Sequence, residues 1–325
     1  MILVTKNTFG WIDFKITNRC NNNCVYCGVT HDSPNFHEII PIEAITNTLD
    51  QAINFGFNFF AFLGGEPSIR QNVTEIFTPF SDEGNLCHLL VITNMQVFHK
   101  ELYRALFNTR AISAYLVASI DRMKSPNFKN QDFDRILSNL ARIRKIANEF
   151  SHLGTRGVQI HSVISRENHF EFGELIKFCS LNTIPISLAM VEPLKIVANK
   201  PKKYNEFTRD ELIQIIKKLG NLNTQYKLEF PNIVLLDYLD DYLTRQLKMA
   251  KCMAGKEHVI IESDGQVYPC LTESYRKGLS FGNIIQEEFQ EIYKRMNNFR
   301  CQNPFNDTCW DHYLWNRLGE HIRRE

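Results

Sequence analysis

Six short apolar runs alternate with amphipathic stretches between Trp11 and Met190, and this alternation limits the possible fold more than any other sequence feature. The predicted strands are Trp11–Thr17, Phe57–Leu63, His88–Thr93, Ile112–Ile120, Gly157–Ile164 and Pro185–Met190. The predicted helices are Ile42–Asn54, His99–Phe107, Phe133–Phe150 and His169–Ser180. Several strands are almost continuously apolar, as in a parallel sheet buried on both faces. The pattern therefore predicts an α/β fold of βαβ units with right-handed crossovers, with too few repeats for an eight-stranded barrel.

Three cysteines lie close together directly after the first predicted strand. The segment from Thr17 to Gly28 reads TNRCNNNCVYCG and contains Cys20, Cys24 and Cys27. Its asparagines tolerate turn and left-handed conformations, so the loop can direct its thiols toward one centre. Thiols at this density predict an iron–sulfur cluster or a metal ion. Three ligands leave one coordination position open, as in catalytic sites, although a zinc ion with a fourth ligand from elsewhere fits the same residues.

A second motif, Gly64-Gly65-Glu66-Pro67, follows the second predicted strand. Two glycines let the backbone approach a ligand closely, the carboxylate is an anionic acceptor, and the proline stiffens the exit from the strand. Taken alone, the motif fits a simple turn from a strand into a helix equally well. It lies one βα unit after the three-cysteine loop, which makes the pair of motifs more specific than either one.

Together the two motifs resemble those of the radical S-adenosylmethionine (radical SAM) superfamily. The cysteine spacing, with the aromatic Tyr26 before the third cysteine, is that of the family's cluster loop. The resemblance implies a partial (β/α)6 TIM-like barrel in which Cys20, Cys24 and Cys27 hold a [4Fe-4S] cluster. It also implies that S-adenosylmethionine chelates the fourth iron, and that the backbone and Glu66 of the second motif bind the methionyl amino group.

Polar residues at later strand ends extend the cofactor site that this resemblance implies. The implied cofactor contacts are Tyr26, Gly64, Gly65, Glu66, Pro67, Asn94, Ser119, Asp121, Ser162 and Glu192. The residues at the later strand ends could equally cap a helix or satisfy a turn. The family's TNG motif reads Thr93-Asn94-Met95 here, so the conformational freedom of glycine is missing and we expect this loop to run differently. Glu192, Asp121, His161 and Tyr268 are also candidate polar contacts or acid–base groups.

The sequence pattern changes after Met190. Prolines and a segment rich in lysine and asparagine mark a boundary, and helices are predicted at Arg209–Leu219 and Ile233–Met249. Asp264-Gly265, between two strand-like runs, predicts a β-hairpin, and a further helical stretch is predicted at Ile284–Met296.

A second group of cysteines accompanies this hairpin: Cys252, Cys270, Cys301 and Cys309. Four thiolates either close a zinc site or ligate one iron–sulfur cluster, and the chemistry alone does not choose between these. Their order resembles the C-terminal SPASM and twitch extensions of radical SAM enzymes. Because full SPASM domains carry three further cysteines, the resemblance implies the shorter, twitch-like arrangement with one auxiliary [4Fe-4S] cluster.

Composition narrows the remaining possibilities. The 325 residues carry a formal net charge of +1, which gives no reason to expect binding to nucleic acid. No apolar run approaches the ~18 residues that span a membrane, and no signal peptide is recognisable. Clustered thiols without an export signal suit the cytoplasm. We expect Cys87 and Cys179 to be buried apolar residues. The expected segments are a radical SAM partial barrel at 1–195, a helical linker at 196–248 and a SPASM/twitch-like auxiliary Fe–S domain at 249–325.

The resemblance implies reductive cleavage of S-adenosylmethionine to a 5′-deoxyadenosyl radical, which then abstracts hydrogen from a substrate. An electron donor such as flavodoxin or ferredoxin is implied as a partner. Maturation of a ribosomally made peptide by crosslink, thioether or epimerisation is slightly favoured over oxidation of a small molecule such as a sugar or aminocyclitol. Only ten residues precede Trp11, which we interpret as too few for a leader-peptide-recognition domain. A non-catalytic zinc-binding protein is the more distant alternative.

Overall fold

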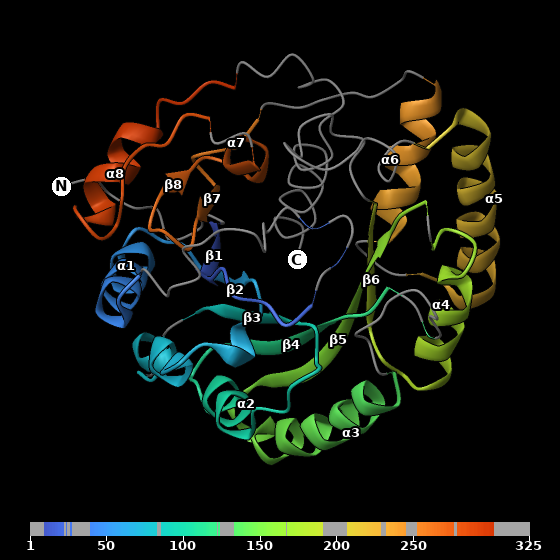
Figure 1. Ribbon diagram of the computed structural model, residues 1–325, viewed down its shortest axis with the longest axis horizontal. Helices are drawn as coiled ribbons and strands as arrows, with labels where there is room; N and C mark the ends of the chain where they lie inside the picture. Colours follow the sequence, from blue (N-terminus) through green and yellow to red (C-terminus); the bar gives the residue numbers. More distant parts are fainter. Residues whose placement is uncertain are drawn as a thin grey trace.

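A curved sheet of eight strands forms the centre of the computed structural model (Figure 1). The structure describes residues 10–22, 24, 27, 40–82, 86–121, 123, 133–166, 168–190, 207–228, 232–244, 252–275 and 278–301. The strand order is β6-β5-β4-β3-β2-β1-β7-β8, so the first six strands lie side by side in chain order. All neighbouring pairs from β6 to β7 are parallel, and only β7 and β8 pair antiparallel. This arrangement confirms the predicted α/β fold with an open, barrel-like sheet.

The first six observed strands agree with the predicted ones to within about two residues at each end, and two further strands form the hairpin. They are β1 (Trp11–Thr17), β2 (Phe59–Gly64), β3 (His88–Thr93), β4 (Ser113–Ser119), β5 (Thr155–Ile164), β6 (Ile186–Met190), β7 (His258–Ile261) and β8 (Val267–Tyr268). The hairpin predicted from Asp264-Gly265 is present, with Ile260 opposite Tyr268 and Ile261 opposite Val267.

Most of the helices lie on the outer side of the curved sheet (Figure 1). They are α1 (Ile42–Asn54), α2 (Lys100–Phe107), α3 (Phe133–Glu149), α4 (Phe172–Leu181), α5 (Arg209–Tyr226), α6 (Asn232–Thr244), α7 (Leu271–Tyr275) and α8 (Phe289–Met296). Short 3-10 helices lie at η1 (Pro67–Ile69), η2 (Val73–Phe80) and η3 (Ser151–Leu153).

Several helices differ in their ends from the predicted ones, and two of these differences are large within the described residues. The helix predicted from Ile284 begins only at Phe289, because the Asn283 side chain accepts a hydrogen bond from the Ile285 backbone and forms a turn there. Helix α5 runs seven residues past the predicted end at Leu219. It starts at a capping box in which Thr208 and Glu211 exchange side-chain to backbone hydrogen bonds.

Strand β1 shows how the sheet divides its side chains between two faces. Ile12, Phe14 and Ile16 are fully buried in the core that the outer face shares with the helices. The residues between them lie on the opposite side, which we call the inner face. There Trp11 stacks on Phe59 of β2, and Phe59 stacks on His88 of β3, in line with the strand register. The inner face therefore carries this row of aromatic rings together with Asp13 and Lys15, while the outward-facing side chains of β1 are apolar.

The C-terminal hairpin is part of the same sheet and the same core as the barrel. Strand β7 pairs with β1 from Trp11 opposite His258 to Phe14 opposite Ile261. His258 and Asp13 are joined by a contact of 2.9 Å between Nε2 and Oδ2, and Lys15 forms a partly buried ion pair with Glu262 and a hydrogen bond to Ser274. These links make the hairpin an extension of the barrel wall.

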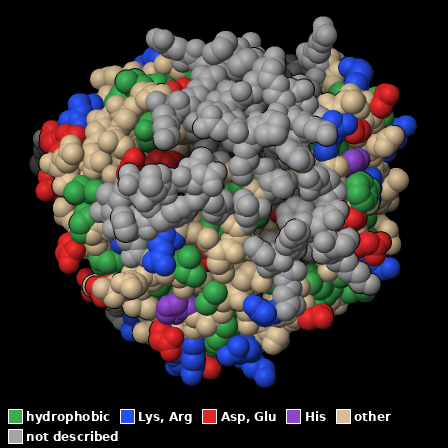
Figure 2. Space-filling view, in the orientation of Figure 1, with side chains coloured by type: hydrophobic (Ala, Val, Ile, Leu, Met, Phe, Trp, Pro, Cys, Tyr) green, Lys and Arg blue, Asp and Glu red, His purple; other side chains and the backbone are tan. Residues whose placement is uncertain are grey.

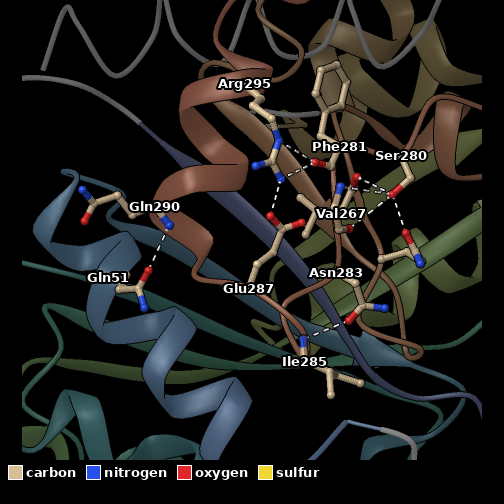
Figure 3. Close-up of polar contacts among 11 residues, drawn as sticks. Gln51, Val267, Ser280, Phe281, Asn283, Ile285, Glu287, Gln290 and Arg295 are labelled. Carbon is tan, nitrogen blue, oxygen red and sulfur yellow. Dashed lines mark hydrogen bonds and ion pairs between the residues drawn. The ribbon is translucent and has the colours of Figure 1, made fainter.

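Helix α8 attaches the hairpin to α1. Phe289 and Tyr293 pack edge-on against Phe57, which lies between α1 and β2. The Gln290 backbone donates a hydrogen bond of 2.9 Å to the Gln51 side chain of α1 (Figure 3). On the hairpin side, Arg295 donates to the Phe281 carbonyl and pairs with Glu287 (Figure 3).

The segment expected to be a linker contributes α5 and α6. These helices pack on each other, α5 packs on α4, and α6 packs on β6. Their apolar residues form a second core with Phe172, Leu188 and Leu235 at its centre. Asn232, at the start of α6, ties this core to β6 by accepting from the Leu188 backbone and donating to the Ile186 carbonyl.

The described surface carries both signs of charge. On the face drawn in Figure 2, acidic and basic side chains are interspersed among the described residues. None of the helices in the described ranges is both long enough and apolar enough to cross a membrane.

Replacing Phe289 by alanine is expected to destabilise the protein by about 3–5 kcal/mol, because a fully buried aromatic ring leaves a cavity between α8 and α1. Phe170→Ala is the matched control, since that ring is 61% exposed and its loss is expected to cost at most about 0.5 kcal/mol. Urea unfolding followed by circular dichroism measures both. If the two substitutions lowered the free energy of unfolding equally, the conclusion that the hairpin and the barrel share one core would be wrong.

Candidate active site

The carboxyl ends of β1, β2 and β3 meet around the three-cysteine loop. The Gly65 backbone donates to the Thr17 carbonyl and the Glu66 backbone donates to the Arg19 carbonyl, each at 2.7 Å. A Cβ atom on Gly64 would lie 2.2 Å from the Thr17 carbonyl oxygen, and one on Gly65 would lie 1.9 Å from that of Arg19. Gly64 also has a φ of +140°, which favours glycine. Both glycines are therefore required for close contact between the end of β2 and the loop.

The three thiols of the loop are half-buried and form no disulfide. The Asn22 backbone donates to the Cys20 sulfur at 3.4 Å, and the Cys27 backbone donates to the Cys24 carbonyl at 3.1 Å. Burial raises the pKa of the Cys20 thiol, and the negative charges of Glu66 and Cys27 raise it further. Thiolates so close together repel one another, and a bound cation or cluster would relieve this. This donor set fits an iron–sulfur cluster. Tyr26 lies outside the described residues.

Glu66 is fully buried between the ends of β2 and β3. One carboxylate oxygen accepts from the Ser68 backbone at 3.0 Å and from the Thr93 hydroxyl at 2.6 Å. The other accepts from the Asn94 backbone at 2.7 Å. Burial raises the pKa of the carboxyl, and these hydrogen bonds act in the opposite direction. Pro67 follows as the first residue of η1 and is also buried.

Asn94 connects the β3 turn to the cysteine loop. Its side-chain nitrogen lies 2.7 Å from Oδ1 of Asn21 and 3.9 Å from the sulfur of Cys20. The next residue, Met95, has a φ of 61° and so takes the left-handed conformation that we expected only a glycine to allow. The Asn139 side chain donates to the Met95 carbonyl at 2.9 Å and holds it there. The turn therefore keeps a glycine-like conformation without glycine.

The predicted residues on β4 and β5 lie on different faces. Ser119 ends β4 and pairs in register with His161, which contacts Ser187 of β6 at 2.9 Å between Nδ1 and Oγ. Burial lowers the pKa of His161 to about 4, so the imidazole is neutral near pH 7. Ser162 is fully buried and alternates with His161, so it points to the outer face. The contact between Ser162 and the cofactor stays a prediction. The outward orientation of the side chain does not favour it.

The Asp121 side chain bonds to the backbone of strand β5. Its Oδ1 accepts from the Val163 backbone at 2.8 Å, and its own carbonyl accepts from Asn168. The side chain is almost completely buried. Asp121 thus joins the ends of β4 and β5, whereas Glu192 lies outside the described residues.

The C-terminal cysteines form a second group. Cys252 hydrogen-bonds to Cys301, and this contact, burial and the nearby charge of Cys270 all raise the pKa of the Cys252 thiol. Within the described ranges, no three cysteine, histidine or acidic side chains already stand in metal-binding geometry. The three thiols are nevertheless close enough to influence one another, and their chemistry fits an iron–sulfur cluster. Cys309 lies outside the described residues.

The remaining cysteines are confirmed as buried apolar residues. Burial raises the pKa of Cys87 and of Cys179 to about 12. Tyr268, a candidate acid–base group, is buried on β8, and burial raises its pKa too.

Several supporting residues were not predicted from sequence. Arg70 is buried and donates to the Ile16 and Ile40 carbonyls on either side of the cysteine loop. Thr93 donates to Glu66, and Lys15 pairs with Glu262 across 247 residues of chain. These residues could have been suspected from sequence because they are polar and lie inside or next to apolar strand segments. The sequence does not, however, identify the groups that they bind.

Comparison with known proteins gives matches to both halves of the chain. The family model described as the radical SAM superfamily matches residues 14–179, slightly more than half of the sequence. The SPASM model, described as an iron–sulfur cluster-binding domain, matches residues 252–311, a range that includes all four C-terminal cysteines. The GTP 3′,8-cyclase of Desulforamulus reducens is 25% identical over 340 residues, covering 95% of this chain and 97% of the cyclase.

Two solved structures share the fold. SuiB of Streptococcus suis, bound to the precursor peptide SuiA, has a TM-score of 0.64 at 17% identity, covering 94% of this chain and 71% of that chain. The enzyme anSMEcpe, with bound AdoMet and the Kp18Cys peptide, has a TM-score of 0.59 at 16% identity, covering 97% and 96%. Because the superfamily model spans more than half of the sequence, the chain belongs to the radical SAM superfamily, and with its SPASM domain it is a radical SAM enzyme that uses S-adenosylmethionine and [4Fe-4S] clusters.

Proposed function

We propose that this enzyme cleaves S-adenosylmethionine at a cluster held by Cys20, Cys24 and Cys27 and thereby modifies a peptide. The observation that carries the first part is the hydrogen-bonded junction of the cysteine loop with the ends of β2 and β3. When bound, the cluster and S-adenosylmethionine supply one-electron cleavage of a carbon–sulfur bond, giving a 5′-deoxyadenosyl radical that abstracts hydrogen.

The protein's own residues position the reactants at this junction. The backbone at Gly64 and Gly65, packed against the loop, would carry the methionyl group beside the three thiols. Ser119 and the neutral His161 lie at the carboxyl ends of β4 and β5, where they can bind polar groups of the cofactor or substrate. Cys252, Cys270, Cys301 and Cys309 would ligate the auxiliary cluster, and a flavodoxin or ferredoxin would donate electrons.

The charge of the inner face supports a peptide over a nucleoside triphosphate. The GTP 3′,8-cyclase relative makes a nucleotide the competing substrate class. Binding a triphosphate requires several cations, whereas on the inner faces of the described strands we find one lysine or arginine, Lys15. That residue is already paired with Glu262. The two structural neighbours that bind peptides support the same assignment by their shared fold.

The first test is iron content and product formation in protein prepared without oxygen. Wild type is expected to hold about eight irons per chain and to form 5′-deoxyadenosine with dithionite and S-adenosylmethionine. The Cys20/Cys24/Cys27→Ala variant is expected to lose about half of the iron and all of the product. Product formation by this variant would contradict the assignment of the loop.

The substrate class can be tested with small-molecule and peptide extracts of the source cells. A fraction below 10 kDa (roughly the upper size of a precursor peptide) is expected to stimulate 5′-deoxyadenosine formation, and treatment of that fraction with protease is expected to abolish the stimulation. Heat-inactivated protease is the control. Stimulation that survives digestion would point to a sugar, aminocyclitol or nucleotide substrate instead.

Gly65→Ala is expected to remove the loop cluster, because its Cβ would lie 1.9 Å from the Arg19 carbonyl oxygen and force the loop away. Gly220→Ala is the matched control: nothing lies within 4 Å of that position in α5, and alanine there favours the helix by up to about 1 kcal/mol. Iron and labile sulfide per chain measure the outcome. A full complement of iron in Gly65→Ala would show that the close contact is dispensable.

A further inference from the structure

The carboxylate of Glu66 is enclosed by protein. It is 0% exposed, and the hydrogen bonds that it accepts come from neutral donors: the Ser68 and Asn94 backbones and the Thr93 hydroxyl. Protein atoms therefore surround the carboxylate, and each of its oxygens already accepts at least one hydrogen bond from them. A buried carboxylate is costly unless such donors satisfy it, and here the donors join two backbone segments, the turn after β2 and the end of β3.

Contacts continue from Glu66 to the first cysteine. The Asn94 backbone is held by the Glu66 carboxylate, and the Asn94 amide oxygen accepts from the Gln96 backbone at 3.0 Å. This second bond fixes the orientation of the amide, whose nitrogen then lies 2.7 Å from Asn21 and 3.9 Å from the Cys20 sulfur. The Glu66 backbone separately donates to the Arg19 carbonyl. Glu66 therefore contacts the loop directly through its backbone and indirectly through Asn94.

We propose that Glu66 is a positioning residue: its buried carboxylate orients Asn94, which in turn holds the Asn21 and Cys20 segment of the cysteine loop in place. The carboxylate then does not bind the methionyl ammonium group, a role that the resemblance had implied. This inference rests on the proposed function, in which the loop holds the cluster.

Charge gives a second consequence. The Glu66 carboxylate lies close to the cysteine loop, since it holds the Asn94 backbone and the Asn94 amide nitrogen lies 3.9 Å from the Cys20 sulfur. A fixed negative charge near an iron–sulfur cluster favours the oxidised state. Removing the charge is therefore expected to raise the midpoint potential of the loop cluster, while removing only a hydrogen bond is not.

The test compares Glu66→Gln with Thr93→Val, which deletes one donor to the carboxylate but leaves the charge. Thr109→Val is the control, since Thr109 is an equally buried threonine whose hydroxyl bonds a carbonyl far from the loop, that of Leu106. Three quantities are measured on reconstituted protein: the rate of iron loss to a chelator, the midpoint potential by electron paramagnetic resonance, and the Kd of S-adenosylmethionine per loaded cluster.

Glu66→Gln and Thr93→Val are both expected to lose the loop cluster at least about tenfold faster than wild type, with a Kd for S-adenosylmethionine within about threefold of it. Only Glu66→Gln is expected to raise the potential. A Kd at least about tenfold weaker in Glu66→Gln, with normal cluster retention and a normal Thr93→Val, would overturn the proposal and assign the carboxylate to the cofactor. Equal iron loss in Thr109→Val would also overturn it. If wild type and the triple cysteine variant held the same iron, the proposed function itself would fail.

Discussion

Close backbone contact between the end of β2 and the cysteine loop is the constraint on which the site depends. Gly65 and Glu66 donate to carbonyls of Thr17 and Arg19, and no side chain fits between these segments. The loop leaves β1 directly at this contact, so its first cysteine starts from a fixed position. Longer asparagine-rich loops have many conformations, and the two backbone hydrogen bonds reduce that freedom before any cluster binds.

The buried Glu66 carboxylate adds a link to the third strand. Burying a charged group away from water destabilises the folded protein by several kcal/mol if the group forms no hydrogen bonds there. At this position the Thr93 hydroxyl and the Asn94 backbone supply them, so the ends of β2 and β3 are held to the same group. Met95 follows in a left-handed conformation that costs a non-glycine residue roughly 1–2 kcal/mol. The surrounding contacts, including that of Asn139, offset this strain.

The pairing of β1 with β7 relates the two cysteine groups. The first group follows β1, and Cys270 follows β8, which is separated from β1 only by β7 in the same sheet. The partly buried pair of Lys15 and Glu262 crosses that boundary, and α8 also packs on α1. The two sites are therefore attached to one rigid wall of strands.

The sequence by itself determined the six parallel strands, the four helices predicted between them, the hairpin and the two cysteine groups, because side-chain periodicity and turn residues act over short distances. Tyr26, Glu192 and Cys309 were predicted as site residues and lie outside the described part of the chain. Only the tertiary structure decided that His161 and not Ser162 faces inward, that Glu66 is enclosed, and that β7 joins β1. The face to which a strand residue points depends on the register of the strand, and the burial of a side chain depends on how the elements pack. The β1–β7 pairing joins residues about 245 positions apart, and no local sequence pattern can predict such a pairing.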